Sequence, residues 1–168
     1  MTHRLVVLAP SMAGAVRSAG GWLFDHVMAG WDVMALVSDL ADARPLQILG
    51  VRALDLEAAL TSPAHGPRPH AVAVDARLYE ADQRVRRAVG ILLEQRLTEV
   101  WVWGGSWPIP DEDDCPVLHT LSVAARAFKA EALAAAAEPP DALGPTELFH
   151  TGDLFDEPFG KEDLVSIG

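Results

Sequence analysis

The sequence predicts a three-layer α/β/α doubly wound sandwich with about five mostly parallel strands and an extended C-terminal arm. Two observations predict this fold. Short apolar runs without alternation, such as residues 5–9 and 70–75, are typical of strands buried on both faces of a parallel sheet. Stretches with apolar residues three and four positions apart, typical of helices, separate these runs. Crossovers between parallel strands are right-handed, so helices are expected on both faces of the sheet.

The first three elements follow directly from the pattern. Residues 5–9 form a continuous apolar run of strand length. Residues 15–29 repeat apolar side chains on one helical face, and Gly30 suits the end of that helix. Residues 31–37 are a second buried strand, and a short helix is expected over residues 41–49.

The middle of the chain repeats the alternation. A third strand is expected over residues 51–54 and one or two helical turns over residues 55–60. Residues 61–69 contain three prolines and a glycine, which predicts a surface loop. Residues 70–75 are a fourth strand, and residues 82–95 are an amphipathic helix.

The last third separates a domain from an arm. Residues 98–103 are expected as a fifth strand, and residues 117–137 as a long alanine-rich helix. Residues 138–168 carry eight acids and one base, with no sustained apolar period. We therefore predict a single α/β domain over residues 1–137 and an acidic extended arm over residues 138–168. The domain is expected to be Rossmann-like or flavodoxin-like.

Composition excludes several classes of protein. The net charge of −11 provides no field that attracts phosphates, so no nucleic-acid partner is expected. No apolar run is long enough to cross a bilayer, so no membrane partner is expected. The single cysteine, Cys115, excludes an intrachain disulfide and fits a cytoplasmic location.

The candidate binding residues follow from the predicted fold, because ligands of such sheets bind outside the carboxyl ends of the strands. The residues expected at those ends are Ser11, Gly14, Asp39, Asp75, Gly104, Gly105, Ser106 and Trp107. Neither GxGxxG nor GxxxxGK[ST] is present, so no cofactor is identified.

Ser11 and Asp39 are the candidates for nucleotide binding, and Ser11 has a second interpretation. Ser11 precedes a predicted helix, whose N-terminus binds a phosphate or is simply capped by the hydroxyl. Asp39 follows the second strand, where an acid meets a ribose hydroxyl in dinucleotide-binding folds.

Residues 31–103 also resemble a response-regulator receiver domain. VMALVSD corresponds to its first strand, and Asp75, at the end of HAVAVD, to its phosphoacceptor. Ser106 loosely takes the place of the hydroxyl residue that follows the next strand. The resemblance implies phosphotransfer on Asp75. The magnesium-binding acids of that family are reduced to Ser38 and Asp39, and the later lysine is absent.

Other groups have chemistry of their own. The acids at residues 111–114 supply oxygens for a hard cation or stabilise the N-terminus of the next helix, and we assign no metal site. Cys115 and His119 lie four residues apart, which on a helix brings a thiol within reach of a base. Arg77, Arg84 and Arg87 form a basic stripe or a solvated helix face.

Two functions remain open. The preferred interpretation is a non-enzymatic module that binds a protein partner or small ligand. It would be a homodimer formed through the C-terminal arm or the helix over residues 117–137. The alternative is an enzyme acting on a small nucleotide- or phosphate-containing molecule in the cleft at the strand ends. The incomplete set of catalytic residues favours the first, and the candidate residues at the strand ends favour the second.

Overall fold

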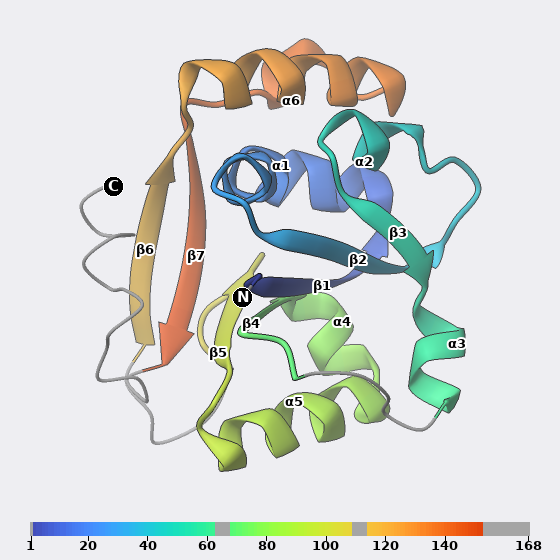
Figure 1. Ribbon diagram of the computed structural model, residues 1–168, viewed down its shortest axis with the longest axis vertical. Helices are drawn as coiled ribbons and strands as arrows, with labels where there is room; N and C mark the ends of the chain where they lie inside the picture. The colour runs from blue at the N-terminus through green and yellow to red at the C-terminus, as the bar shows by residue number, and fades with distance from the viewer. Residues whose placement is uncertain (1, 63–67, 109–113, 153–168) are drawn as a thin grey trace.

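The computed structural model describes residues 2–62, 68–108 and 114–152, and these form one seven-stranded sheet in the order β3-β2-β1-β4-β5-β7-β6 (Figure 1). The first five strands are mutually parallel: β1 (Arg4–Ser11), β2 (Asp32–Asp39), β3 (Arg52–Asp55), β4 (Ala71–Asp75) and β5 (Glu99–Trp103). β7 (Thr146–Gly152) runs antiparallel to both of its neighbours, β5 and β6 (Asp114–Thr120).

The prediction of an α/β fold with a mostly parallel sheet is confirmed, whereas the expected number of strands is wrong. All five predicted strands are present, but β6 and β7 add two more. β6 lies just before and over the start of the predicted helix over residues 117–137. β7 lies within the predicted arm, so part of residues 138–168 is a sheet strand. Whether residues 138–168 behave as a separate unit stays a prediction.

Alternation explains β6, although a proline partly hides it in the sequence. Val117 and His119 are buried, while Pro116, Leu118 and Thr120 are exposed, which is the two-residue period of a strand with one covered face. The helix that follows, α6 (Val123–Ala135), begins only where the hydroxyl of Ser122 accepts a hydrogen bond from the Ala125 amide.

Helices cover both faces of the sheet (Figure 1). One face carries α1 (Met12–Met28) and α2 (Arg44–Ile48), with α6 packed over them. The other face carries α3 (Leu56–Thr61), α4 (Ala76–Ala81) and α5 (Gln83–Gln95). A short 3-10 helix, η1 (Pro140–Ala142), lies between α6 and β7 in the chain and contacts α6.

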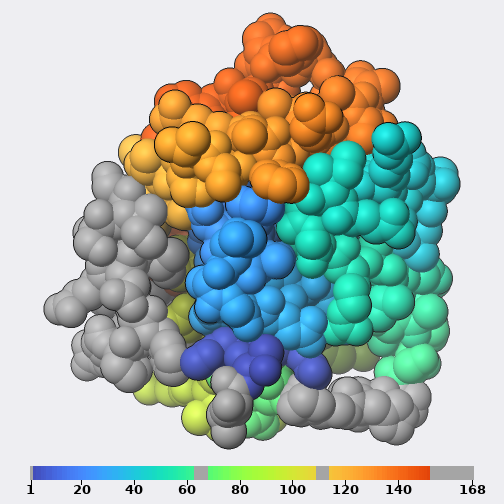
Figure 2. Space-filling view, turned by 45° about the horizontal axis from the view of Figure 1, so that its top comes forward, coloured from blue at the N-terminus to red at the C-terminus, as the bar shows by residue number. Residues whose placement is uncertain are grey.

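The middle of α1 is buried because it lies between the sheet and α6. Figure 2 shows α6 (orange) against both α1 (blue) and α2 (teal). Residues 19–24 of α1 are all buried. Gly20 and Gly21, which could weaken a helix, lie inside it without ending it. A Cβ on Gly21 would come within 2.2 Å of Leu121 Cγ. Because glycine has no Cβ, Leu121, in the segment before α6, can pack directly against the backbone of α1.

A buried ion pair joins α1, α6 and β7. Glu147 and Lys129 are 2% and 1% exposed at their side chains, and Lys129 Nζ lies 2.7 Å from Glu147 Oε2. The amides of Gly21 and Trp22 donate to the Glu147 carboxylate at 2.8 and 2.7 Å. Lys129 also donates to the carbonyl of Arg17, the group that Gly21 would use in a regular helix. The ion pair therefore provides hydrogen-bond partners for backbone groups in the middle of α1.

The strand order corrects the resemblance to a receiver domain. In the flavodoxin-like order, the first strand lies beside the third. In the receiver-domain correspondence, β2 and β4 would have to be neighbours, but β1 lies between them and pairs with both.

In the described residues, no helix is long and apolar enough to cross a membrane.

His26 makes the stability of the fold dependent on pH. Its ring lies 4.5 Å from that of Trp22, and its Nδ1–H donates to the Trp22 carbonyl at 2.8 Å. Burial lowers the pKa of His26 to about 4. The unfolded chain, with an ordinary histidine pKa of about 6.5, binds the proton more readily. We therefore expect the neutral ring's contribution, up to about 3 kcal/mol, to be present above pH 6.5 and lost as the pH falls to 4.

Urea unfolding of the wild type and of His26→Leu, measured at pH 7 and pH 4.5, tests this prediction. The variant lacks the titrating ring, so its free energy of unfolding should fall less than that of the wild type between the two pH values. Equal losses in both proteins would show that His26 does not contribute to the acid sensitivity.

Candidate functional site

The carboxyl ends of the parallel strands bring several candidate residues to one edge. Ser11 at the end of β1 pairs with Asp39 at the end of β2. Asp75 at the end of β4 pairs with Trp103 at the end of β5. The strand order reverses between β1 and β4, which is the place where sheets of this kind bind ligands.

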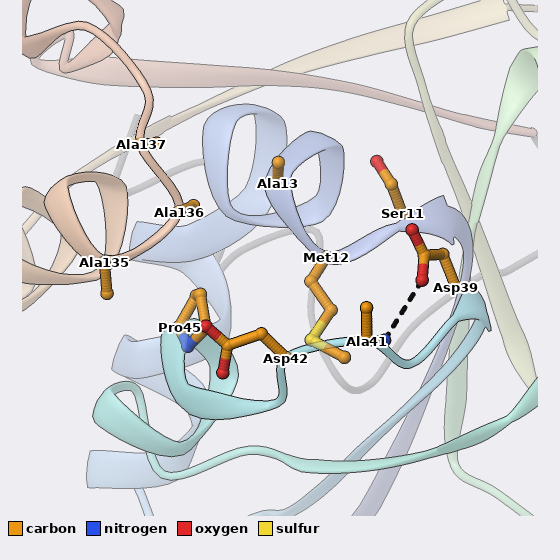
Figure 3. Close-up of a pocket in the computed structure, with 10 residues that line it drawn as sticks. All are labelled: Ser11, Met12, Ala13, Asp39, Ala41, Asp42, Pro45, Ala135, Ala136 and Ala137. Atoms are coloured by element: carbon orange, nitrogen blue, oxygen red, sulfur yellow. Dashed lines mark hydrogen bonds between the residues drawn. The ribbon is translucent and has the colours of Figure 1, made fainter.

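A cavity of about 270 Å³ opens at the ends of β1 and β2. Figure 3 shows Ser11 and Asp39 together on one side and Asp42 and Pro45 of the α2 region on another, with Met12 between them. Residues 135–137, at and just beyond the end of α6, line a further side of the cavity. Its polar groups therefore come from β1, β2 and the segment that leads into α2.

Local backbone contacts fix these polar side chains. The hydroxyl of Ser11 accepts from the Gly14 amide at 3.1 Å, which caps α1. Asp39 Oδ1 accepts from the Ala41 amide at 3.0 Å, and Asp42 Oδ1 accepts from the Arg44 amide at 3.0 Å. Among the described residues, the second oxygen of each carboxylate has no hydrogen-bond partner, so it is available to a ligand.

The charge of the cavity indicates what it can hold. Two carboxylates, Asp39 and Asp42, line it, and none of its lining residues is basic. Carboxylates repel a phosphate and attract an ammonium or a hydrogen-bond donor. The cavity therefore suits a neutral or cationic molecule better than the nucleotide or phosphate ligand considered from the sequence.

The other candidate residues at the strand ends lie elsewhere. The carboxylate of Asp75 accepts from the amides of Arg77 and Leu78 and caps α4, and Asp75 does not line the cavity. Gly104 has a φ of +80° at the end of β5 and lines a different cavity. The position for a Cβ on Gly105 lies 2.9 Å from Ala76 Cβ. Ser106 is exposed.

Trp107 belongs to the core of the opposite face. It is 7% exposed and packs in the cluster that α4 and α5 form against the sheet. Trp101 is also buried, with its ring 5.9 Å from that of Trp22. Of the eight candidate binding residues, the structure thus brings Ser11 and Asp39 together in the cavity, with Gly14 beside Ser11.

The proposed thiol and imidazole pair is not formed. Cys115 and His119 lie on β6, where four residues span about 13 Å rather than one helical turn. Nε2 of His119 instead lies 2.8 Å from Asp25 Oδ2. Cys115 and His119 are far apart because a strand, β6, forms where the start of a helix was predicted.

The charged clusters have structural partners where they are described. Arg84 forms a two-oxygen ion pair with Glu57 and a second pair with Asp82, so it is not part of a free basic stripe. Residues 111–113 of the acid cluster lie outside the described residues, and Asp114 pairs with Nδ1 of His150 at 2.7 Å. Across the described ranges, no three His, Cys, Asp or Glu side chains form a group that could hold a metal ion.

Sequence reasoning missed Asp42 and the pair of Lys129 and Glu147. Asp42 lies three residues beyond the strand-end Asp39, so a wider window at each strand end would have included it. Lys129 looked like one more charge on an alanine-rich helix, and Glu147 lay in a region expected to be an extended arm. A buried pair made from two such segments has no local pattern.

No family model and no curated protein sequence matches this chain. Solved structures share its fold over nearly their whole length. They include a deacetylase triple mutant of the teicoplanin biosynthetic pathway (TM-score 0.67, 14% identity, covering 92% of this chain and 100% of that one). They also include the A40926 pseudoaglycone deacetylase Dbv21 (TM-score 0.63, 14% identity, 94% and 100%). The conserved protein TT1542 from Thermus thermophilus is more distant (TM-score 0.54, 16% identity, 86% and 92%).

These comparisons correct the preferred functional interpretation. The expectation of a non-enzymatic binding module is wrong in the light of solved structures of the same fold that are deacetylases. The alternative, an enzyme that acts on a small molecule, fits these neighbours better. At 14% identity the likeness establishes the fold, so the reaction of this chain has to be argued from its own residues.

Proposed function

We propose that this protein is a small-molecule enzyme that hydrolyses an N-acyl group in the cavity at the ends of β1 and β2. The observation that carries the proposal is the pair of carboxylates, Asp39 and Asp42, in a cavity whose lining residues include no base. Hydrolysis of an N-acyl amine releases an ammonium, which two carboxylates attract. The deacetylases that share the fold support this class of reaction.

The site has groups for each part of such a reaction. A carboxylate of Asp39 or Asp42 takes a proton from water, and the water oxygen bonds to the acyl carbon. The first turn of α1 has backbone N–H groups without helical partners, and they favour the negative charge that develops on the acyl oxygen. The C–N bond then breaks, and the amine leaves with the proton that the carboxylate took up.

A direct assay tests the proposal. The purified protein is incubated with a panel of N-acetylated small amines, and released acetate and released amine are measured together. We expect equal amounts of both. Asp39→Asn and Asp42→Asn each keep the shape of the side chain but remove its basicity, so at least one should lower the rate by about 10²-fold or more.

Glu94→Gln provides the matched control. Glu94 is an exposed acid on α5, which covers the opposite face of the sheet, so the rate should stay at the wild-type value. Full activity in both aspartate variants would place the reaction outside this cavity. If the wild type releases neither product from any member of the panel, hydrolysis of N-acetyl groups is not its reaction.

A further inference from the structure

The charges that line the cavity at the ends of β1 and β2 restrict the substrate as well as the reaction. Asp39 and Asp42 line it, and none of its lining residues is basic. Arg44 belongs to the same segment but is not a lining residue, and Arg17 of α1 pairs with Glu138 Oε1 at 2.9 Å. The cavity is therefore negative before a substrate enters it.

An N-acyl amide by itself gains nothing from this negative charge, because the amide is neutral. The ammonium that hydrolysis releases forms only after the C–N bond breaks, so its attraction to the carboxylates holds the product and does not recruit the substrate. A cavity with two carboxylates attracts a substrate that is positively charged from the start. The second carboxylate therefore favours a substrate with a cation separate from its amide.

The two carboxylates lie in different parts of the cavity. Asp39 lies beside Ser11, next to the first turn of α1 with its free backbone N–H groups (Figure 3). Asp42 lies beside Pro45 of α2, on the other side of Met12 (Figure 3). Asp39 is thus the carboxylate next to the groups that favour negative charge on the acyl oxygen, and Asp42 is left for a second part of the substrate.

The surface between the two carboxylates is apolar. Met12 lies between them in Figure 3, and Pro45 and the three alanines at residues 135–137 line the same cavity. Methylene groups pack favourably against such a surface. Asp39 and Asp42 are three residues apart, so their Cα atoms are separated by at most about 11 Å. A short aliphatic chain therefore fits between them.

We propose that the substrate is an N-acylated diamine, a short aliphatic chain with the amide at one end and an ammonium at the other. This inference rests on the hydrolytic function proposed above. Asp39 faces the amide, the methylene chain lies along Met12, and the free oxygen of Asp42 accepts a hydrogen bond from the ammonium. The ammonium takes no part in the bond changes, and Asp42 holds it in place while water adds to the acyl carbon.

Three acetamides of equal length test the proposal with the intact protein. All have an acetamide followed by four methylene groups, and they end in an ammonium, a methyl group or a carboxylate: N-(4-aminobutyl)acetamide, N-pentylacetamide and 5-acetamidopentanoate. Acetate release gives kcat/KM for each. We expect the ammonium compound to exceed the methyl compound by about fivefold, the effect of an ion pair that stays partly open to water. The carboxylate compound should be the slowest.

Asp42→Asn identifies the residue that binds the ammonium. The variant removes the charge and keeps the shape, so the ratio of kcat/KM between the ammonium and methyl compounds should fall from about five to about one, whatever the absolute rates. In Asp39→Asn both rates should fall together, and most of the ratio should remain. Glu94→Gln, on the opposite face of the sheet, is the matched control and should keep both the rates and the ratio.

Binding without turnover separates this proposal from the reaction. n-Pentylammonium chloride carries the ammonium but no amide, and it is titrated to about 100 mM because so small a ligand binds weakly. The backbone amide of Arg44, which donates to Asp42 Oδ1 at 3.0 Å, reports on binding by nuclear magnetic resonance. We expect a saturable shift that sodium chloride at equal ionic strength does not produce, and about fivefold weaker binding in Asp42→Asn. Saturable binding without hydrolysis of any of the three acetamides would support the ammonium site and reject the reaction.

Three results would overturn the proposal even if hydrolysis is observed. The first is an equal kcat/KM for the ammonium and methyl compounds, which would mean that the charges of the cavity do not select the substrate. The second is a preference for the carboxylate compound, which would mean that a base from another part of the chain reaches the substrate. The third is a preference for the ammonium compound that Asp42→Asn leaves unchanged, which would assign the cation to another residue.

Discussion

Lys129→Met is expected to lower the free energy of unfolding by about 3–5 kcal/mol at pH 7, the range found when one partner of a buried ion pair is removed. Lys129 is 1% exposed, and its ammonium lies 2.7 Å from Glu147. Methionine has a similar length but no charge and no donor. The variant therefore leaves a buried carboxylate without its cation and the Arg17 carbonyl without the donor it has in the wild type.

The pH dependence of this loss separates electrostatics from packing. Burial raises the pKa of Glu147, and Lys129 opposes that rise. Without the ammonium, the pKa in the folded variant should be higher still. A folded-state pKa above the unfolded value means that the folded state binds the proton more tightly, so stability rises as the pH falls through it. The deficit of Lys129→Met should therefore shrink in acid.

Urea unfolding at pH 7 and pH 5 measures both effects. Lys129→Met/Glu147→Gln removes the buried charge while keeping an amide oxygen for the α1 amides, so it should recover part of the lost stability. Arg126→Met, on the exposed face of the same helix, is the control and should change stability by less than about 0.5 kcal/mol. A deficit that is the same at both pH values would mean that packing, not charge, explains the loss.

The fold was predictable where local pattern and tertiary position agree. Residues 70–75 read as a strand in the sequence, and residues 71–75 form β4 at the centre of the sheet. A strand covered on both faces needs apolar side chains at nearly every position. β6 was not predictable in the same way. Its alternation includes Pro116 and runs directly into an alanine-rich segment, so helical propensity concealed the strand.

The candidate site was predictable only in part. The rule for strand ends selected Ser11 and Asp39, which do meet, because register fixes neighbours at the end of a parallel pair. It also selected Asp75, whose carboxylate caps α4 and lies outside this cavity. A capping aspartate and a ligand-binding aspartate occupy the same place in a sequence, and only the direction of the side chain separates them.

Gly21→Ala is the second large effect expected, with a loss of about 2 kcal/mol in the free energy of unfolding. In most helices alanine in place of glycine is stabilising by up to about 1 kcal/mol. At this position the new Cβ would lie 2.2 Å from Cγ and 2.4 Å from Cδ2 of Leu121, so α1 and the chain before α6 must move apart. The same movement would strain the amide hydrogen bonds to Glu147.

Gly20 and Gly90 provide controls, because alanine at either position should raise the free energy of unfolding rather than lower it. A Cβ on Gly20 makes only ordinary contacts, the nearest at 3.4 Å, and a Cβ on Gly90 has nothing within 4 Å. Both alanine variants should therefore gain about 0.5–1 kcal/mol. In a double-mutant cycle, Leu121→Ala removes the side chain that Gly21→Ala meets, so the double variant should be less destabilised than the sum of the single losses.

Additive losses would mean that the contact with Leu121 is not the cause. A stabilising Gly21→Ala would contradict the close packing of α1 against the chain before α6. If the contact is the cause, the glycine pair has a defined purpose. Gly21 lets the Leu121 segment approach, and that approach brings Lys129 and Glu147 to the backbone of α1, so the residue that weakens the helix locally is what allows the buried pair to form.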